Sequence, residues 1–358
     1  MVIRRRAFAA MSAAVLIWSA SLLAQNSPPQ QQQRKLSDAE KKEIQLVLKM
    51  VDEVAAGQPA PNDLSLTWAR EDLLKAQGNK QYLPFSVMID PSKVNGGKVS
   101  VYWRVVAKNG AAAPAAEAGK KDDKKDDDKN KKPEYAYEDI NTVTLPAGQT
   151  GPTRISRSFT VAPGDYDVFV VVKEPTPEKA PKNAPPAKVS LVKQAVTVPN
   201  LWNDELNTSS VIVAERIDPL PAPLTPQQQT ERPYALGTME IVPALDTKFT
   251  KTSELSTFLL IYNAKTDSAN KPDVSVEYSF YTKQAGAEKF FNKTNPQNLN
   301  AQTLPPQFDF AAGHQLQSGQ AVPLASFPEG DYRLEIKITD KIANKTLTRE
   351  MNFSITGS

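Results

Sequence analysis

Residues 162–174 read APGDYDVFVVVKE, and residues 328–340 read PEGDYRLEIKITD. Each stretch carries Gly-Asp-Tyr, followed by apolar residues at every second position. Successive side chains of a β-strand point to opposite faces, so this alternation predicts a strand with one buried face in each place. The occurrence of one phrase in two places also indicates that a larger segment of the chain is repeated.

Four further pairs of segments occur in the same order around these two strands. They are residues 84–90 and 257–263, 98–106 and 273–281, 144–146 and 303–305, and 188–198 and 347–355. Five landmarks in one order predict two copies of one module, over residues 63–198 and 234–358. Trp103 and Tyr278 occupy equivalent places in the two copies, on the strand where immunoglobulin-like sandwiches bury an aromatic residue.

The repeated glycine and tyrosine predict the kind of sandwich. In immunoglobulin-like sandwiches a tyrosine near the start of the penultimate strand turns its hydroxyl back onto a nearby backbone group. A glycine just before it makes the tight turn. Gly164 and Tyr166 fit these roles in the first copy, and Gly330 and Tyr332 fit them in the second. The sequence therefore predicts a mostly β chain with two tandem immunoglobulin-like antiparallel β-sandwiches.

The first residues predict export. In residues 1–24, Arg4, Arg5 and Arg6 precede an apolar run, which is the pattern of a cleaved secretory signal peptide. Residues 25–36 follow as a polar, disordered tether. We therefore expect a periplasmic, cell-surface or extracellular protein with no membrane span after signal cleavage. An uncleaved anchor and a twin-arginine route are the alternatives.

Residues 37–57 predict an amphipathic helix in front of the first sandwich. Ser37 and Glu40 have the spacing of a capping box. Apolar residues then recur at helical spacing, at Ile44, Val47, Leu48, Val51 and Val54. Since a helix with one apolar stripe is stable only when that stripe is covered, this helix must pack on another surface.

An apolar outer face distinguishes the first copy from the second. Tyr102, Val106, Phe169 and Val171 point away from the predicted core of the first sandwich, whereas outward positions of the second are charged. Apolar surface of this kind usually marks an interface. These four residues are therefore the candidate interaction face. Its cover is either the helix of residues 37–57, the second module or a separate protein.

Three segments lie between the predicted strands. Residues 111–134 begin with alanines and continue as a lysine- and aspartate-rich run over residues 120–132 that has no apolar residue, which predicts a disordered loop, with a calcium site as the alternative. Residues 284–305 form an excursion at the equivalent place of the second copy, and such loops often carry binding sites. Residues 199–233 predict a proline-rich linker in which residues 211–213 add an edge strand.

The composition excludes several classes of chemistry. The chain has no cysteine and a single histidine, His314, so thiolate and histidine-rich metal sites are not expected. Three of its 43 basic residues lie in the signal, and the rest balance the 40 acidic residues, which argues against nucleic acid as a partner. Neither a phosphate-binding loop nor a nucleophile elbow is present. We expect no enzyme activity, no metal and no cofactor.

Part of the chain resembles a group of bacterial proteins. The stretches NLWNDELNTSSVIVAERIDPL, RPYALGTMEIVPALDTKF and FPEGDYRLEIKITD are similar to the C-terminal portions of secreted proteins related to the von Willebrand A and GWxTD groups. The resemblance covers residues 198–355. The metal-binding Asp-x-Ser-x-Ser and the Gly-Trp-x-Thr-Asp motif are both missing. It therefore implies an exported sandwich, and no catalytic or metal-binding residue.

Two functions fit these observations. The first is a non-enzymatic protein that engages another protein through a sheet edge or through the apolar outer face of the first module. The second is a glycan-binding module of the cell envelope. The glycan function requires that aromatic residues line one open groove. The candidates for that groove are Trp68, Trp202, Tyr135 and Tyr137.

Overall fold

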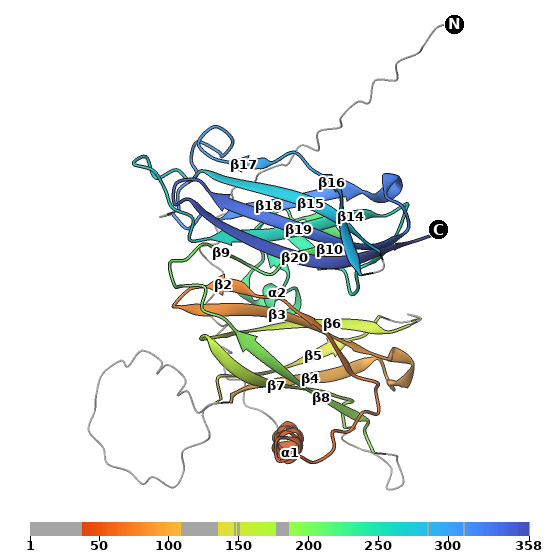
Figure 1. Ribbon diagram of the computed structural model, residues 1–358. Helices are drawn as coiled ribbons and strands as arrows, with labels where there is room; N and C mark the ends of the chain where they lie inside the picture. Colours follow the sequence, from red (N-terminus) through yellow and green to blue (C-terminus); the bar gives the residue numbers. More distant parts are fainter. Residues whose placement is uncertain are drawn as a thin grey trace, which may run out of the picture. The chain divides into compact units, whose positions relative to one another are not determined.

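The computed structural model of the chain is mostly β and divides into two compact units (Figure 1). It describes residues 38–108, 135–146, 148, 151–176, 186–284, 286–310 and 312–357. The predicted signal, tether and charged loop lie outside the described residues. The N-terminal unit contains the described residues up to Glu205 together with Leu224–Ala235. The C-terminal unit contains Leu206–Pro223 and the residues from Leu236 onward.

The N-terminal unit is a sandwich of two four-stranded sheets. In one sheet β3 pairs with β1, β2 and β6, and the other has the order β5-β4-β7-β8. The elements of this unit are α1 (Asp38–Ala55), β1 (Thr67–Glu71), β2 (Leu74–Ala76), β3 (Lys80–Ile89), the 3₁₀ helix η1 (Pro91–Lys93), β4 (Lys98–Ala107), β5 (Tyr137–Thr144), β6 (Thr153–Val161), β7 (Gly164–Lys173), β8 (Val189–Val198) and α2 (Pro226–Glu231). Alternate residues of β3, β4, β6 and β7 fill the core between the sheets.

The C-terminal unit is a sandwich of two larger sheets. One has the order β11-β12-β10-β14-β18 with β9 beside β14, and the other has the order β13-β20-β19-β15-β16 with β17 beside β15. The elements are β9 (Asn207–Thr208), β10 (Ile212–Pro219), β11 (Ala235–Leu236, at the boundary of the two units), β12 (Met239–Pro243), β13 (Lys248–Thr250), β14 (Glu254–Tyr262), β15 (Val274–Gln284), β16 (Ala287–Lys293), β17 (Gln297–Leu299), β18 (Leu316–Pro323), the 3₁₀ helix η2 (Leu324–Ser326), β19 (Gly330–Asp340) and β20 (Lys345–Thr356). The strand β13 pairs in parallel with β20.

The two units share one strand register, as the sequence repeat requires. The equivalent cross-strand pairs are Trp103–Val170 and Ala107–Tyr166 in the N-terminal unit, and Tyr278–Ile336 and Thr282–Tyr332 in the C-terminal unit. Trp103 and Tyr278 are both fully buried. Each satisfies its polar atom across the sandwich, Trp103 by donating to the carbonyl of Ser158 and Tyr278 by bonding Ser318 Oγ at 2.7 Å.

Both predicted corner tyrosines have the geometry of a tyrosine corner. The hydroxyl of Tyr166 donates to the carbonyl oxygen of Ala162 at 2.9 Å. The hydroxyl of Tyr332 donates to that of Pro328 at 2.7 Å. The glycines two residues before them, Gly164 and Gly330, have φ of +155° and +141°, which side chains rarely adopt.

The segment of residues 199–233 differs from the predicted linker. It contains β9, β10 and α2, and the unit boundaries divide it between the two sandwiches. The strand β10 pairs with both β12 and β14, so it is an internal strand and not an edge strand. Thr225 caps α2 with a complete capping box, and Pro226 starts the helix. The second sandwich therefore begins at residue 206, about 28 residues earlier than predicted.

None of the helices in the described part of the chain combines the length and the hydropathy that a membrane span requires.

Candidate binding surfaces

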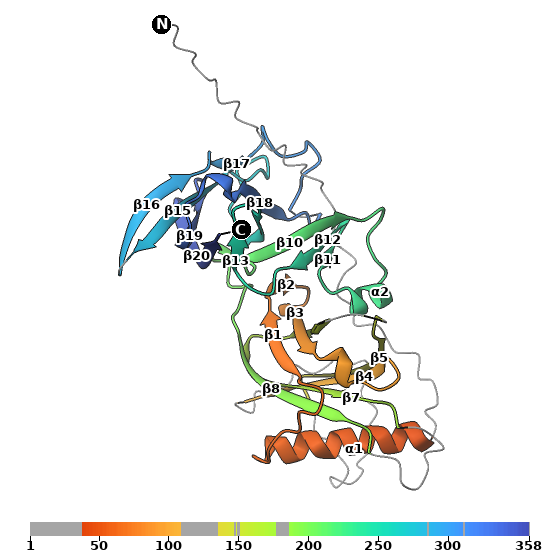
Figure 2. The same cartoon turned by 90° about the vertical axis from the view of Figure 1, so that its right-hand side faces the viewer.

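The helix α1 runs along β7 and β8 (Figure 2) and covers the apolar outer face of the N-terminal unit. Tyr102, Phe169 and Val171 are 3%, 2% and 1% exposed, and Val106 is half-buried. The helix contributes its buried stripe, Val47, Val51 and Val54, to the same cluster. The face is therefore not open to a partner in this structure. Of the three covers that the sequence allowed for these four residues, the structure shows the amphipathic helix at Asp38–Ala55, which removes their apolar area from water.

A buried arginine ties α1 to the sheet. The Arg104 side chain is 2% exposed, and its guanidinium bonds Asp52 of α1 at 2.9 Å and Glu138 of β5 at 3.1 Å. It also donates to the hydroxyl of Tyr102 and stacks 3.7 Å from the ring centroid of Tyr135. Burial, together with the hydrogen bond to Glu138, raises the pKa of Tyr102. The charge of Arg104 is thus fully compensated within the unit.

A second ion pair fixes the other half of α1. Lys173 of β7 is buried, and its ammonium bonds Glu43 at 2.7 Å, the carbonyl of Glu174 at 3.0 Å and Thr176 Oγ1 at 2.8 Å. The helix is therefore held by an apolar stripe and by ion pairs at Glu43 and Asp52.

The equivalent outer face of the C-terminal unit is polar. Arg333 lies at its centre and bonds three carboxylates, those of Glu288 at 2.8 Å, Glu335 at 2.9 Å and Glu350 at 2.8 Å. Its guanidinium also stacks over the ring of Tyr281 at 4.4 Å. These hydrogen bonds, of which the one to Glu335 contributes most, raise the pKa of Arg333. Glu335 occupies the position of Phe169 in the first unit, so the two copies differ most on this face.

The hairpin of β15 and β16 extends from this face (Figure 2). Among the described strands, β16 pairs only with β15, so its other edge is unpaired. Six of its seven residues are exposed, and Phe290 is 52% exposed although it is apolar. Phe291 alone turns toward the core, with its ring 4.8 Å from that of Phe327. This change of direction coincides with a register shift between Phe280 and Tyr281.

A shallow hollow of about 540 Å³ lies beside the hairpin. It is lined by Lys283, Glu288, Arg333, Glu350, Met351 and Asn352. Lys283 bonds Asn352 Oδ1 at 2.7 Å and pairs with Glu288 at 3.8 Å, so the polar groups of the hollow already satisfy one another. The hollow has little apolar lining with which to hold a small molecule.

The four aromatic residues proposed for a glycan site do not form one groove. Trp68 stacks on Phe85 with ring centroids 4.9 Å apart, and Tyr137 stacks on Trp103 at 6.3 Å. Both therefore pack against the core of the first sandwich. The ring of Tyr135 is taken by Arg104, as described above. Trp202 is 37% exposed, with Lys75 Nζ over its ring at 4.0 Å. The four aromatic residues thus do not line the open groove that glycan binding would require.

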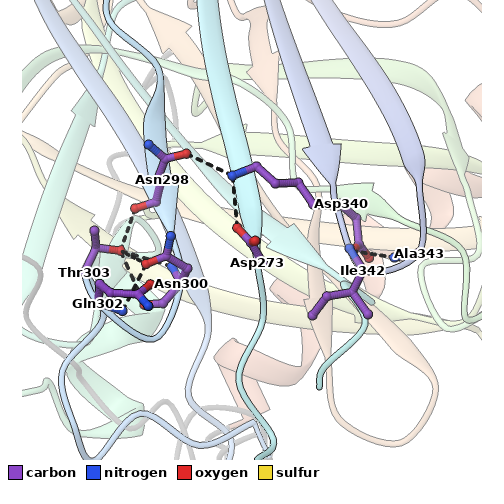
Figure 3. Close-up of polar contacts among 9 residues, drawn as sticks. Asp273, Asn298, Asn300, Gln302, Thr303, Asp340, Ile342 and Ala343 are labelled. Atoms are coloured by element: carbon purple, nitrogen blue, oxygen red, sulfur yellow. Dashed lines mark hydrogen bonds and ion pairs between the residues drawn. The ribbon is translucent and has the colours of Figure 1, made fainter. Parts of the chain in front are cut away.

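Polar loops meet at one end of the C-terminal unit (Figure 3). The carboxylate of Asp340, 1% exposed, accepts three backbone N–H groups, those of Lys265, Ile342 and Ala343. Lys341 Nζ bonds Asp273 at 3.1 Å and Asn298 at 3.2 Å. These bonds lock the loops to one another, so the cluster is structural.

The single histidine of the chain is engaged within its own loop. His314 Nδ1 accepts the backbone N–H of Asp309, and its ring packs 5.8 Å from Phe308. In the part of the chain that the structure describes, no three His, Cys, Asp or Glu side chains gather closely enough to hold a metal ion.

Comparison with known proteins assigns no family. No model of a protein family and no curated protein matches the chain. Among solved structures, that of Salmonella alpha-2-macroglobulin reacted with methylamine aligns with 14% identity and a TM-score of 0.20. The alignment covers 83% of this chain and 17% of that chain. A likeness at this level carries no functional argument.

The sequence reasoning missed two features of these surfaces. The residues of β16 lie in the segment that the sequence predicts as a loop excursion; the signal for a hairpin is Gly286 with aromatic residues on both sides, at Tyr281 and Phe290. The role of Arg104 was also missed. Its signal is a single charged residue at the centre of an otherwise apolar outward row, at the register position between Tyr102 and Val106.

Proposed function

We propose that this chain is an exported, non-enzymatic binding protein that engages another protein through the free edge of β16. The observation that carries the proposal is that one edge of β16 is unpaired and exposed among the described strands. This edge presents an exposed, unpaired row of backbone groups with an exposed phenylalanine at its centre. Such an edge is a template for an added strand, and β-strand addition is a common way for sandwich domains to bind peptides.

The edge of β16 is favoured over the outer face of the N-terminal unit because α1 already covers that face. Because α1 buries Phe169 and its neighbours, a partner there would have to displace the helix and leave Arg104 without its Asp52. The edge of β16 requires no such rearrangement.

The sequence supports the remaining parts of the proposal. The signal-like residues 1–24 favour export to the periplasm or the cell surface. The resemblance to secreted von Willebrand A-related and GWxTD-type proteins points the same way. Sandwich folds carry many functions, so the fold itself adds no weight to any one of them.

Site-specific photocrosslinking in cells tests the proposal. A photoreactive residue replaces Phe290, and a matched control replaces Ile342, which is 41% exposed in the same unit. We expect one defined partner to be captured from position 290 and not from position 342. Hydrogen exchange of the purified pair should then show new protection at alternate amides of β16, as an added strand requires. Equal capture at both positions, or protection confined to other strands, would reject the edge as the binding site.

A further inference from the structure

Resting on the proposed function, we infer that the segment added to β16 is acidic and places an apolar side chain beside Phe290. This follows from the charges and the exposed ring that β16 presents to anything that pairs with its free edge.

The register of the hairpin places these side chains. Phe290 lies opposite Tyr281 and Glu288 lies opposite Lys283, so both point to the outer face of the sheet. Phe290 contacts Tyr281 edge to face, with ring centroids 5.8 Å apart. Lys289 lies opposite Thr282 and therefore points to the other face. Lys293 lies opposite Ser279, on the same outer face as Phe290. An added strand thus meets Phe290 and Lys293 on the outer face and Lys289 on the other.

The charges of β16 are unevenly compensated. Glu288 is engaged by Arg333 at 2.8 Å and by Lys283 at 3.8 Å. Lys289 and Lys293 are both exposed, and neither has a carboxylate within 4.0 Å among the described residues. The single acid of the strand is therefore neutralised, while its two bases are available. Opposite charges on directly facing residues stabilise strand pairs, so an acidic segment is favoured at this edge.

The aromatic contact specifies a second property of the partner. Half of the Phe290 surface is in water although its ring is held by Tyr281. A cross-strand apolar residue would bury this area, and such aromatic pairs add to the stability of a sheet. Because neighbouring residues of a strand face opposite sides, the partner needs an apolar residue and an acidic residue next to each other.

Edge lysines have a competing explanation. Lysine on an exposed edge discourages sheets from pairing with one another, whatever the protein binds. The two explanations differ in outcome. If the lysines only prevent edge pairing, no strand-forming peptide should bind β16. If they attract an acidic strand, binding should depend on the charge of the peptide and on salt.

The test uses the purified mature chain and three synthetic peptides. The peptides have equal length and alternate valine with glutamate, glutamine or lysine, and each carries a fluorescent label for anisotropy. We expect the glutamate peptide to bind roughly twofold tighter than the glutamine peptide, since its glutamates lie on one face and reach Lys289 alone, and one exposed ion pair supplies about 0.5 kcal/mol. The preference should weaken at high salt, and binding should protect amides of β16 from hydrogen exchange.

Two double variants locate the effect. Lys289→Glu with Lys293→Glu should reverse the preference toward the lysine peptide. Lys337→Glu with Lys345→Glu changes the net charge of the same unit equally, away from β16, and should leave the preference unchanged. Reversal by this control pair would mean that net charge alone attracts the peptide, which overturns the inference.

The remaining outcomes separate the inference from the proposed function. If all three peptides bind equally and protect β16, the edge binds strands but the acidic inference is wrong. If no peptide binds and position 290 still crosslinks to one partner, the acidic inference is again wrong and the edge proposal stands. If neither occurs, both are wrong.

Discussion

At the scale of single residues, the two tyrosine corners show how closely the copies agree. Tyr166 and Tyr332 lie in different environments, since the ring of Tyr332 stacks on Phe353 and contacts Phe327. Both nevertheless donate to the carbonyl four residues upstream. The corner is therefore fixed by the local chain, Gly-Asp-Tyr after a proline-containing turn, and the sequence was sufficient to predict it.

Removal of either hydroxyl should destabilise one unit only. We expect Tyr166→Phe and Tyr332→Phe each to lower the free energy of unfolding of their unit by about 1 kcal/mol, the usual net value of one hydrogen bond. Trp68, Trp103 and Trp202 belong to the N-terminal unit, and Trp18 lies in the predicted signal peptide. In a chain that begins at residue 25, tryptophan fluorescence therefore reports the N-terminal unit, and far-UV circular dichroism reports both units. In urea, Tyr166→Phe should shift the fluorescence transition and Tyr332→Phe should not. Tyr281→Phe is the neutral control, because Tyr281 makes ring contacts with Phe290 and Arg333 but its hydroxyl makes no hydrogen bond among the described residues.

The buried Tyr278 should make the C-terminal unit sensitive to alkali. Burial raises its pKa from 10.0 to about 12, opposed by hydrogen bonds with Ser318 and Thr257. Because the folded pKa lies above the unfolded one, the stabilisation is fully present below pH 10 and is lost as the pH rises to 12. The loss should reach roughly 2–3 kcal/mol, at about 1.4 kcal/mol per pKa unit. Tyr278→Phe should reduce the fall in the free energy of unfolding between pH 10 and pH 12, as measured by urea titrations followed by circular dichroism. If the free energy of unfolding of this variant falls as steeply as that of the wild type, the loss of stability at high pH comes from other groups.

At the scale of elements, α1 shows what the sequence could and could not predict. The helical spacing of Val47, Val51 and Val54 predicted both the helix and its buried stripe. The apolar outward row around Phe169 predicted that something covers it, and the structure identifies α1 as the cover. The ion pair of Asp52 with Arg104 was not predictable, because 52 residues separate the two and hydrophobic periodicity says nothing about which charges meet. The hairpin strand β16 was not predictable for another reason, because four of its seven residues are polar and give no alternating apolar pattern.

Two neighbouring carboxylates of α1 provide a matched test of this docking. Asp52 bonds the buried Arg104, whereas Glu53 pairs with Lys49 at 3.6 Å, with both side chains largely exposed. We expect Asp52→Asn to lower the stability of the N-terminal unit by about 1 kcal/mol, moderated because Glu138 still compensates the arginine. Glu53→Gln should change it by no more than a few tenths of a kcal/mol. Urea unfolding followed by tryptophan fluorescence measures both. Equal effects would mean that the buried pair does not help to hold α1.

At the scale of the whole molecule, the repeat was predictable and the path of the chain between the copies was not. Five landmarks revealed two sandwiches because four of them are strands with an alternating pattern and the fifth, Thr-Leu-Pro, buries its leucine in both copies. Residues 199–233 have no such pattern, and their prolines suggested a linker. In the structure, Tyr234 instead bonds the buried carboxylate of Asp72 at 2.8 Å, and Tyr82 bonds the carbonyl of Pro233. The segment of residues 224–235 thus completes the N-terminal unit after the chain has already entered the C-terminal one.

Truncation tests whether residues 224–235 stabilise the N-terminal unit. A chain of residues 25–205 retains every strand of the first sandwich but lacks residues 224–235. We expect its fluorescence-detected free energy of unfolding to fall by roughly 2–4 kcal/mol, because burial of one large side chain and a hydrogen bond to a carboxylate contribute about that much. The full-length Tyr234→Ala variant should reproduce most of the loss, since Tyr234 is 3% exposed and supplies both terms. A truncated chain as stable as the N-terminal unit of the full-length protein would show that residues 224–235 are only a connection.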